Sequence, residues 1–286
     1  MTDSLLSSGG KSEIIKAVKK KDFAGIIGIL EKHKTGHAGT AKMKDKRFAL
    51  NEIVKYITQN SEFPEKEFFE TGKFFCERKE DNSKEIGVSI IWKGYGYDKK
   101  NAERILVKIA DDKNWEVREY AGGAFANVMF YHNDFFGKAV KLAKHKSENV
   151  RRAVLFSVLG LVNKNETGKS FKIIELLMHD SSVYVKRNLG PFILGSYILR
   201  KHTDETMSML KKWSKSDNVN IKWNVIMSFK NAFGNQNPGL AFMILSEFKN
   251  EKDKALQRAL KSVLGFLSKK HEKEVNRFII NTGLNF

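Results

Sequence analysis

Apolar residues recur at helical spacing along most of the chain. Stretches such as AERILVKIA (102–110) and ALKSVLGFLSKK (259–270) place apolar side chains three and four positions apart, the spacing of one helix face. Alternating, strand-like stretches between turn signals are scarce, and the chain has only three prolines. This pattern predicts an all-α protein with about fifteen helices of ordinary length.

The main body of the chain repeats one short motif. A β-branched residue or leucine, here called the anchor, is followed by a long and usually basic side chain. Asp, Ser or Asn residues precede the later anchors, in HDSS, KSDN and NEKD, and these residue types predict helix N-caps. A further unit starts near Ile86. The anchors lie 33, 35, 36 and 35 positions apart and are Val117, Val150, Val185, Ile221 and Leu256.

A helical pair that recurs at this period predicts an α-solenoid, in which each pair buries its apolar stripe against its neighbours. The pattern is typical of HEAT repeats and predicts a right-handed superhelix. The basic stretch His33–Lys46 has no periodicity and is expected to be a loop. We therefore expect an N-terminal helical segment with this loop at 1–46 and the repeat domain at 47–286, or one continuous domain over 1–286.

Charge points to the class of partner. Lys and Arg number 51 against 33 Asp and Glu, a formal net charge of +18. Such an excess favours a polyanion, and we expect nucleic acid, in the form of double-stranded DNA. The seven histidines lack the spacing of zinc ligands, so we expect neither a metal nor a cofactor.

The sequence carries no signal for a membrane or a disulfide framework. It has no run of eighteen apolar residues, and its N-terminus lacks the apolar stretch of a signal peptide. Cys76 is the single cysteine, so no internal disulfide can form. We expect a cytoplasmic monomer.

A basic column follows the anchors. The residues two positions after each anchor are Glu119, Arg152, Arg187, Trp223 and Arg258. If the second helix of each pair lines a concave surface, this column predicts a track for a phosphate backbone. The alternative is that such arginines bridge neighbouring repeats through carboxylates. The candidate DNA-binding residues are Arg118, Arg152, Arg187, Lys222, Trp223 and Arg258.

The segment NWEVREYAGGAF (114–125) carries the candidate chemistry. Trp115 and Glu119 are four positions apart and share a helix face. Gly122 and Gly123 follow, and would allow a close approach by a neighbouring helix or by DNA. The alternatives are a core role for Trp115 and an ion pair between Glu119 and Arg152.

These segments resemble the bacterial DNA alkylation-repair glycosylases built from HEAT-like repeats, the AlkD and AlkC group. The resemblance covers roughly residues 80–270. It rests on Trp115 with Glu119, on ENVRRAVLFSVLG with Arg152, and on VYVKRNLGPFILG. In the family the first place holds a Trp and, four residues later, a catalytic Asp. The second holds an Arg near the lesion.

The resemblance implies a glycosylase that removes N3- and N7-alkylated bases from DNA. Glu119 would stabilise the oxocarbenium charge that develops on the sugar, and Trp115 would form one wall beside the cationic base. Two positions depart from the family. Glu119 replaces the Asp, and Pro191 stands where AlkD-like members place a second pocket Trp, with Phe192 next to it. The alternative function is a non-catalytic HEAT-repeat scaffold that binds DNA, RNA or an acidic protein.

Overall fold

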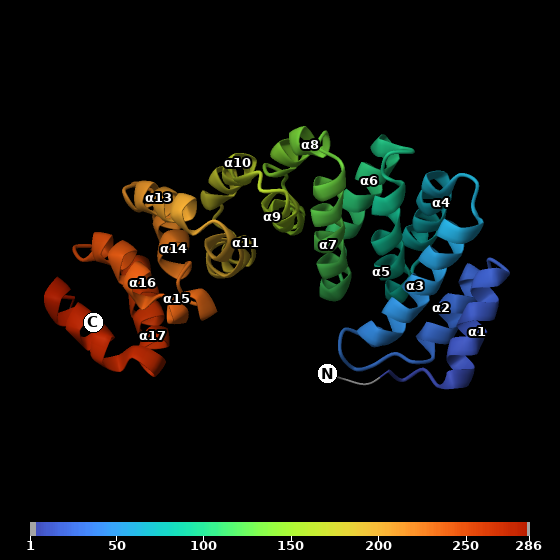
Figure 1. Cartoon of the computed structure of the whole chain (residues 1–286), viewed down its shortest axis with the longest axis horizontal. Coiled ribbons are helices and arrows are strands. Elements are labelled where there is room, and N and C mark those ends of the chain that lie inside the picture. Colours follow the sequence, from blue (N-terminus) through green and yellow to red (C-terminus); the bar gives the residue numbers. More distant parts are fainter. Residues whose placement is uncertain (1–3, 285–286) are drawn as a thin grey trace. The chain divides into compact units, whose positions relative to one another are not determined.

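The structure is a computed structural model that describes residues 4–284. Within this range the regular elements are helices, and the β-pairing consists of an isolated bridge between Lys34 and Ala41. The predicted fold class is confirmed, because the chain is an all-α solenoid of helices stacked in chain order (Figure 1). It divides into two compact units, Met1–Phe135 and Phe136–Phe286.

The first unit has an inner and an outer row of helices. The inner helices α3, α5 and α7 pack on one another in turn, and the outer helices α4 and α6 cover them. Buried side chains of α1 and α2 join those of α3, α4 and α5 in one apolar cluster. The elements are α1 (Ser8–Lys19), α2 (Phe23–Glu31), α3 (Met43–Asn60), α4 (Pro64–Glu77), α5 (Asp81–Ile91), the 3₁₀ turn η1 (Trp92–Gly94), α6 (Lys99–Ala110) and α7 (Trp115–Tyr131).

The second unit by itself also has an inner and an outer row of helices. Its inner row is α9, α11 with η2, α14 and α17, each packed on the next, and α10, α13 and α16 lie outside. The elements are α8 (Phe135–Leu142), which begins at the unit boundary, α9 (Glu148–Asn163), α10 (Thr167–Met178), α11 (Val183–Asn188), η2 (Leu189–Ile198), α12 (Leu199–Lys201), α13 (Thr203–Ser214), α14 (Val219–Met227), α15 (Ala232–Gln236), α16 (Pro238–Leu245), η3 (Ser246–Phe248) and α17 (Lys254–Thr282).

The five inner helices that carry the anchors begin with a capping side chain, as the sequence predicts for the last three. The caps lie three positions before the anchors, and each cap side chain accepts a hydrogen bond from a backbone N–H of the first turn. The anchors themselves are buried, so the spacing of the anchors along the sequence matches the spacing of the stacked helical pairs. The N-caps are Asn114, Ser147, Ser182, Asn218 and Asp253.

Charged rungs join neighbouring repeats within each unit. An acid two positions before an N-cap accepts from the N–H of the cap residue and pairs with the basic residue of the preceding inner helix. This resembles the bridging alternative considered for the arginines, and in the second unit it involves the residues directly after the anchors Val150 and Ile221. The rungs are Lys84–Asp112 at 2.9 Å, Arg151–Asp180 at 2.5 Å and Lys222–Glu251 at 2.9 Å.

The inner helix that contains Pro191 widens into a π-helix, η2. Proline has no N–H and its ring collides with the carbonyl one turn earlier, and a wider turn accommodates both constraints. The Pro191 carbonyl accepts hydrogen bonds from Ser196 Oγ and Asn231 Nδ2, each at 3.0 Å. Gly195 allows the close packing here, since a Cβ would collide with the Ser228 carbonyl oxygen. The proline is therefore accommodated within the helical stretch.

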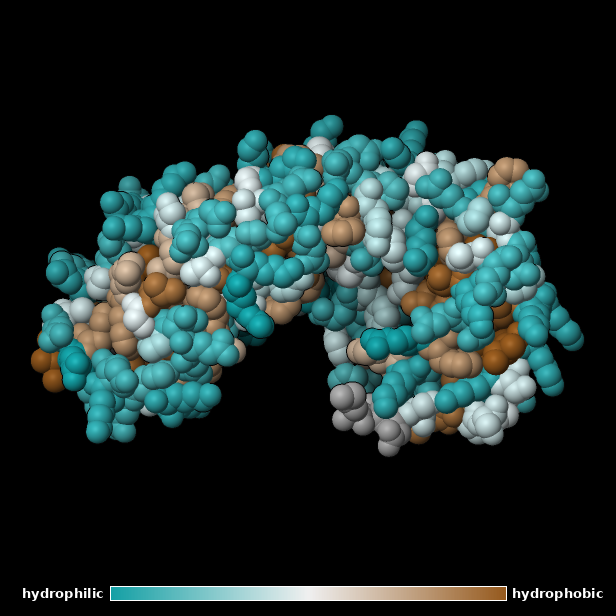
Figure 2. Space-filling model, in the orientation of Figure 1, coloured by the Kyte–Doolittle hydropathy of each residue, from teal (hydrophilic) through white to brown (hydrophobic). Residues whose placement is uncertain are grey.

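The expected loop lies between α2 and α3, and α3 starts earlier than the sequence suggests, at Met43. Ala38 and Gly39 have positive φ values, and the Thr35 N–H donates to the Thr40 carbonyl, which closes the loop. The proposed boundary between 46 and 47 therefore falls inside α3, although the division into 1–46 and 47–286 stays a prediction. Figure 2 shows hydrophilic side chains over most of the visible face of each unit.

We predict that Arg151→Ala lowers the free energy of unfolding by about 2 kcal/mol, because it leaves the Asp180 carboxylate, 6% exposed, without its bidentate partner. Arg187→Ala removes the same side chain from an exposed position and should cost less than about 0.5 kcal/mol. Urea unfolding of both variants measures the difference. Equal costs would show that the rungs contribute nothing to repeat stacking.

Candidate functional site

The first turn of α7 brings Trp115 to the surface. Its side chain is 43% exposed, and its ring meets the edge of His37 at a centroid distance of 5.1 Å. The loop that carries His37 is held on this helix by the N-cap residue, because Asn114 Nδ2 donates to the Ala38 carbonyl at 2.8 Å. Trp115 is thus an exposed aromatic beside a docked loop, and a core role is excluded.

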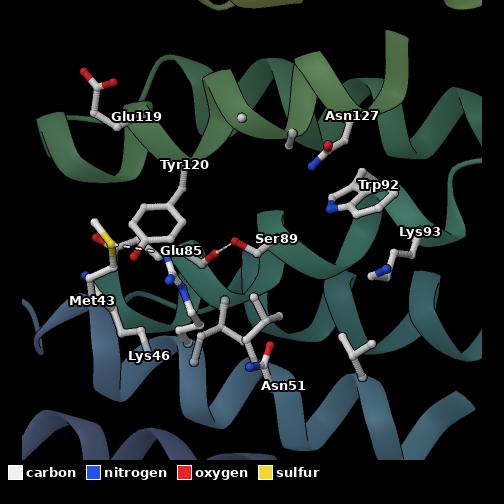
Figure 3. Close-up of a pocket in the computed structure, with 16 residues that line it drawn as sticks. Met43, Lys46, Asn51, Glu85, Ser89, Trp92, Lys93, Glu119, Tyr120 and Asn127 are labelled. Carbon is white, nitrogen blue, oxygen red and sulfur yellow. Dashed lines mark hydrogen bonds and ion pairs between the residues drawn. The ribbon is translucent and has the colours of Figure 1, made fainter. Parts of the chain in front are cut away.

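One turn further along α7, Glu119 lines a cavity of about 560 Å³. The cavity lies between α3, α5 and α7, inside the first unit (Figure 3). Gly123 also lines it, and a Cβ at this position would meet no atom within 4 Å. The expected open surface next to Glu119 is therefore present at Gly123, whereas Gly122 is buried. Trp115 is not among the residues that line the cavity.

The cavity combines aromatic, cationic and amide side chains. Figure 3 shows Glu119 at one end with its carboxylate directed away from Tyr120, and Trp92, Lys93 and Asn127 at the other end. The polar and aromatic lining residues are Lys46, Arg47, Asn51, Glu85, Ser89, Trp92, Lys93, Glu119, Tyr120 and Asn127.

A buried ion cluster forms the floor. Lys46 Nζ lies 2.5 Å from Glu85 Oε2 and 3.2 Å from Glu116 Oε1, and it donates to Thr40 Oγ1 at 3.2 Å. Thr40 in turn donates to Glu116 at 2.5 Å, so the cluster ties α3, α5 and α7 to the loop. The ring of Tyr120 covers the ammonium group, with 5.1 Å between Nζ and the ring centroid.

Burial dominates the protonation of this cluster. Loss of hydration raises the pKa of Glu85 to about 7, and the attraction of Lys46 opposes this shift only in part. Burial, with the nearby carboxylates of Glu85 and Glu116, also raises the pKa of the Tyr120 hydroxyl. The carboxylates beside Lys46 balance its positive charge, so the floor offers no net positive charge to a ligand.

The far end of the cavity carries a cation on an aromatic surface. Trp92 stacks on Tyr131 at a centroid distance of 5.3 Å, and Lys93 Nζ lies 4.3 Å from the centroid of Trp92. Burial lowers the pKa of Lys93. In the described part of the chain, neither Lys93 nor the exposed Arg47 pairs with a carboxylate. These two cations are available to an anionic ligand.

The structure separates the predicted DNA-binding residues into two groups. Arg118 Nη1 donates to the Asp112 and Lys113 carbonyls at 2.9 Å, and Lys222 pairs with Glu251, so both hold the start of a repeat. Arg152 is 4% exposed and lies between the rings of Phe156 and Tyr184, at 4.6 and 4.7 Å. In this conformation it presents little surface to a phosphate.

The remaining candidates are accessible. Arg187 and Arg258 are exposed, and Trp223 is half-buried with Lys186 Nζ 4.7 Å from its ring centroid. Trp223 and Arg258 line a shallow pocket together. The DNA contacts of all six residues stay predictions. The alternative pairing of Glu119 with Arg152 joins residues of the two units and also stays a prediction.

Several lining residues escaped the sequence analysis. Glu85 directly precedes the apolar stretch IGVSII and follows the polar segment DNSK, so the local sequence gives no signal that its charge is buried. Lys46 falls at the end of the stretch assigned to a loop. Trp92 and Lys93 belong to a 3₁₀ turn that no repeat pattern predicts.

The described residues show neither a metal site nor a membrane span. Residues 4–284 contain no group of three or more histidine, cysteine, aspartate or glutamate side chains arranged to hold a metal ion. No helix in the same range is both long enough and apolar enough to cross a bilayer.

Comparisons with known proteins give only distant likenesses. No family model matches the chain, and no curated protein matches it. YibA of E. coli shares 16% sequence identity at a TM-score of 0.43, over 99% of this chain and 94% of YibA. An engineered protein shares 13% sequence identity at a TM-score of 0.32, over 96% of this chain and 76% of the engineered protein. A designed armadillo repeat protein, in complex with the peptide (KR)4, shares 15% sequence identity at a TM-score of 0.29, over 91% of this chain and 100% of the designed protein. The function of this chain therefore rests on its own residues.

We predict that Glu85 makes the fold less stable as the pH rises. A carboxyl whose pKa is about 7 when folded and 4.5 when unfolded binds its proton more tightly in the folded state. Its contribution is therefore full below pH 4.5 and is lost as the pH rises through 7, with a slope of at most about 1.4 kcal/mol per pH unit. Denaturant unfolding between pH 5 and 8 should show this decline in the wild type and a flatter profile in Glu85→Gln. Parallel profiles would show that Glu85 ionises normally.

Proposed function

We propose that this protein binds DNA and releases alkylated bases from it, with Glu119 as the carboxylate that faces the sugar. The observation that carries the proposal is the position of Glu119. It is half-buried at the edge of a cavity of about 560 Å³, beside the open surface at Gly123. A cavity of this volume falls within the range of small-molecule sites.

The proposed reaction does not require strong acid catalysis by the protein. An N-alkylated purine is already cationic and leaves readily, while positive charge develops on the sugar. A preorganised carboxylate stabilises that charge, and it can also orient the water that attacks the sugar. Glu119 sits on a helix whose N-cap and anchor are both fixed by the repeat, so its backbone has a defined position at the cavity.

Trp115 would act from the adjoining surface and not from within the cavity. It is exposed one turn before Glu119 on α7, and the ring of His37 packs against it at a steep angle. A cationic base is attracted to the face of an indole ring. The docked loop would therefore help to hold the aromatic surface against which the damaged nucleotide lies.

The charge of the chain supports a polyanionic partner. The net charge of +18 would attract DNA of any base sequence through its phosphates. Arg187 and Arg258 are the exposed members of the predicted column, and Arg47 and Lys93 are the unpaired cations at the cavity.

A non-catalytic scaffold is the second candidate. The burial of Arg152 between two rings favours it, because the arginine that the glycosylase reading places near the lesion is engaged in packing. Such a scaffold would bind DNA, RNA or an acidic protein through the same exposed cations.

We predict that the double variant Arg187→Glu, Arg258→Glu binds duplex DNA more weakly and with a shallower dependence on salt. Each lost phosphate contact removes about 0.9 from the slope of log K against log salt concentration. Anisotropy titrations at several salt concentrations measure both quantities. An unchanged slope would place the phosphate contacts on other residues.

We predict that Glu119→Gln reduces the release of alkylated base from methylated DNA by about a hundredfold or more, as expected when one preorganised electrostatic group is removed. Glu205→Gln is the matched control, because it removes the same charge from an exposed site on α13. DNA affinity should be alike in the two variants. Equal release by wild type and Glu119→Gln would contradict a catalytic role, and no release by either would favour the scaffold.

A further inference from the structure

The cavity between α3, α5 and α7 has a composition that the proposed reaction does not explain. A site for a cationic base alone would carry acids and aromatic rings. Here Lys93 lies over Trp92 at 4.3 Å, and Arg47 lies at the rim. The floor cation Lys46 is already neutralised by Glu85 and Glu116. The cations that remain call for an anionic group on the ligand.

Other lining groups call for an aromatic ring with polar edges. Tyr120 lines the cavity with its ring, and the contact with Lys46 holds that ring in place, whereas the ring of Trp92 is already engaged by Tyr131 and Lys93. Asn51 and Asn127 line the cavity, and among the described residues their amides have no hydrogen-bond partner. An amide can both donate and accept at the edge of a nucleobase.

The length of the cavity fits both requirements at once. Glu119 and Asn127 line it from positions eight residues apart on α7, which corresponds to about 12 Å along a helix axis. A mononucleotide extends over a similar length, with its phosphate and base separated by the sugar. The volume of about 560 Å³ leaves room for such a ligand with some water.

We propose that this cavity binds a single nucleotide, with its base against Tyr120 and its phosphate at Lys93. The nucleotide is either an unpaired residue of a DNA strand or a free mononucleotide. The shared chemistry is one phosphate joined through a sugar to one aromatic base. Stacking on aromatic side chains and contact with cations are the means by which proteins hold unpaired nucleotides.

The burial of Lys93 supports this assignment. Its pKa is lowered because the ammonium group loses hydration without gaining a carboxylate partner in residues 4–284. A phosphate would supply the missing charge. The inference uses the proposed DNA binding only for the strand as one source, and it does not need Glu119 to be catalytic.

Gly123 offers a way to fill the cavity without touching its chemistry. It is exposed on α7, and a Cβ there meets no atom within 4 Å, so Gly123→Leu should fold while its side chain occupies the cavity. Gly265→Leu is the matched control, because Gly265 is also exposed within a helix, α17, with open space around it. Lys93→Gln removes one cation and leaves the volume nearly unchanged.

The test compares binding of a duplex with one bulged nucleotide, the same duplex fully paired, and deoxyadenosine 5′-monophosphate. For the strand source, we expect wild type and Gly265→Leu to prefer the bulged duplex by about tenfold. Gly123→Leu should lose this preference, and Lys93→Gln should reduce it. If the ligand is a free mononucleotide, the monophosphate should bind wild type and Gly265→Leu but not Gly123→Leu. Wild type should then bind the two duplexes equally.

Two results would overturn the proposal. One is that wild type neither prefers the bulged duplex nor binds the monophosphate. The other is that Gly123→Leu behaves as wild type towards both. Because these readouts measure binding, a failure of base release would leave them unaffected.

Discussion

The buried anchor at the start of each inner helix is the contact on which the rest of the structure depends. A single helical pair cannot bury its own apolar stripe, so every pair must stack on a neighbour. The N-cap three positions earlier fixes where the inner helix begins, and the anchor then enters the interface at the same depth in each repeat. Because this geometry recurs, the inner helices align side by side, and the residues between them have fixed positions.

The cavity is a consequence of a departure from this packing. Between α3, α5 and α7 the space is not filled by apolar side chains. Its floor is instead the ion cluster of Lys46, Glu85 and Glu116. Buried ion pairs contribute little net stability compared with apolar packing, and this cluster joins α3, α5 and α7 to the loop that carries Thr40. Gly123 adds to the opening because it has no side chain.

The sequence predicted the repeat well because its signals are local. Val117, Val150 and their counterparts recur at nearly constant spacing, and the cap residues are of types that favour helix N-termini. Glu119 could be placed at a site because it lies on such a helix. The floor could not be predicted, since Lys46 and Glu85 are brought together by the packing of α3 on α5, and no local pattern encodes that pairing. The same holds for Arg152, whose burial depends on the aromatic side chain of Tyr184 in the next repeat.

A crystal structure of the full chain bound to a duplex that carries one bulged nucleotide measures most directly whether DNA chemistry occurs where α7 borders this cavity. We expect the bulged nucleotide to lie between α3, α5 and α7, beside the turn of α7 that carries Glu119. A complex in which the cavity is empty and Glu119 lies away from the DNA would contradict this expectation.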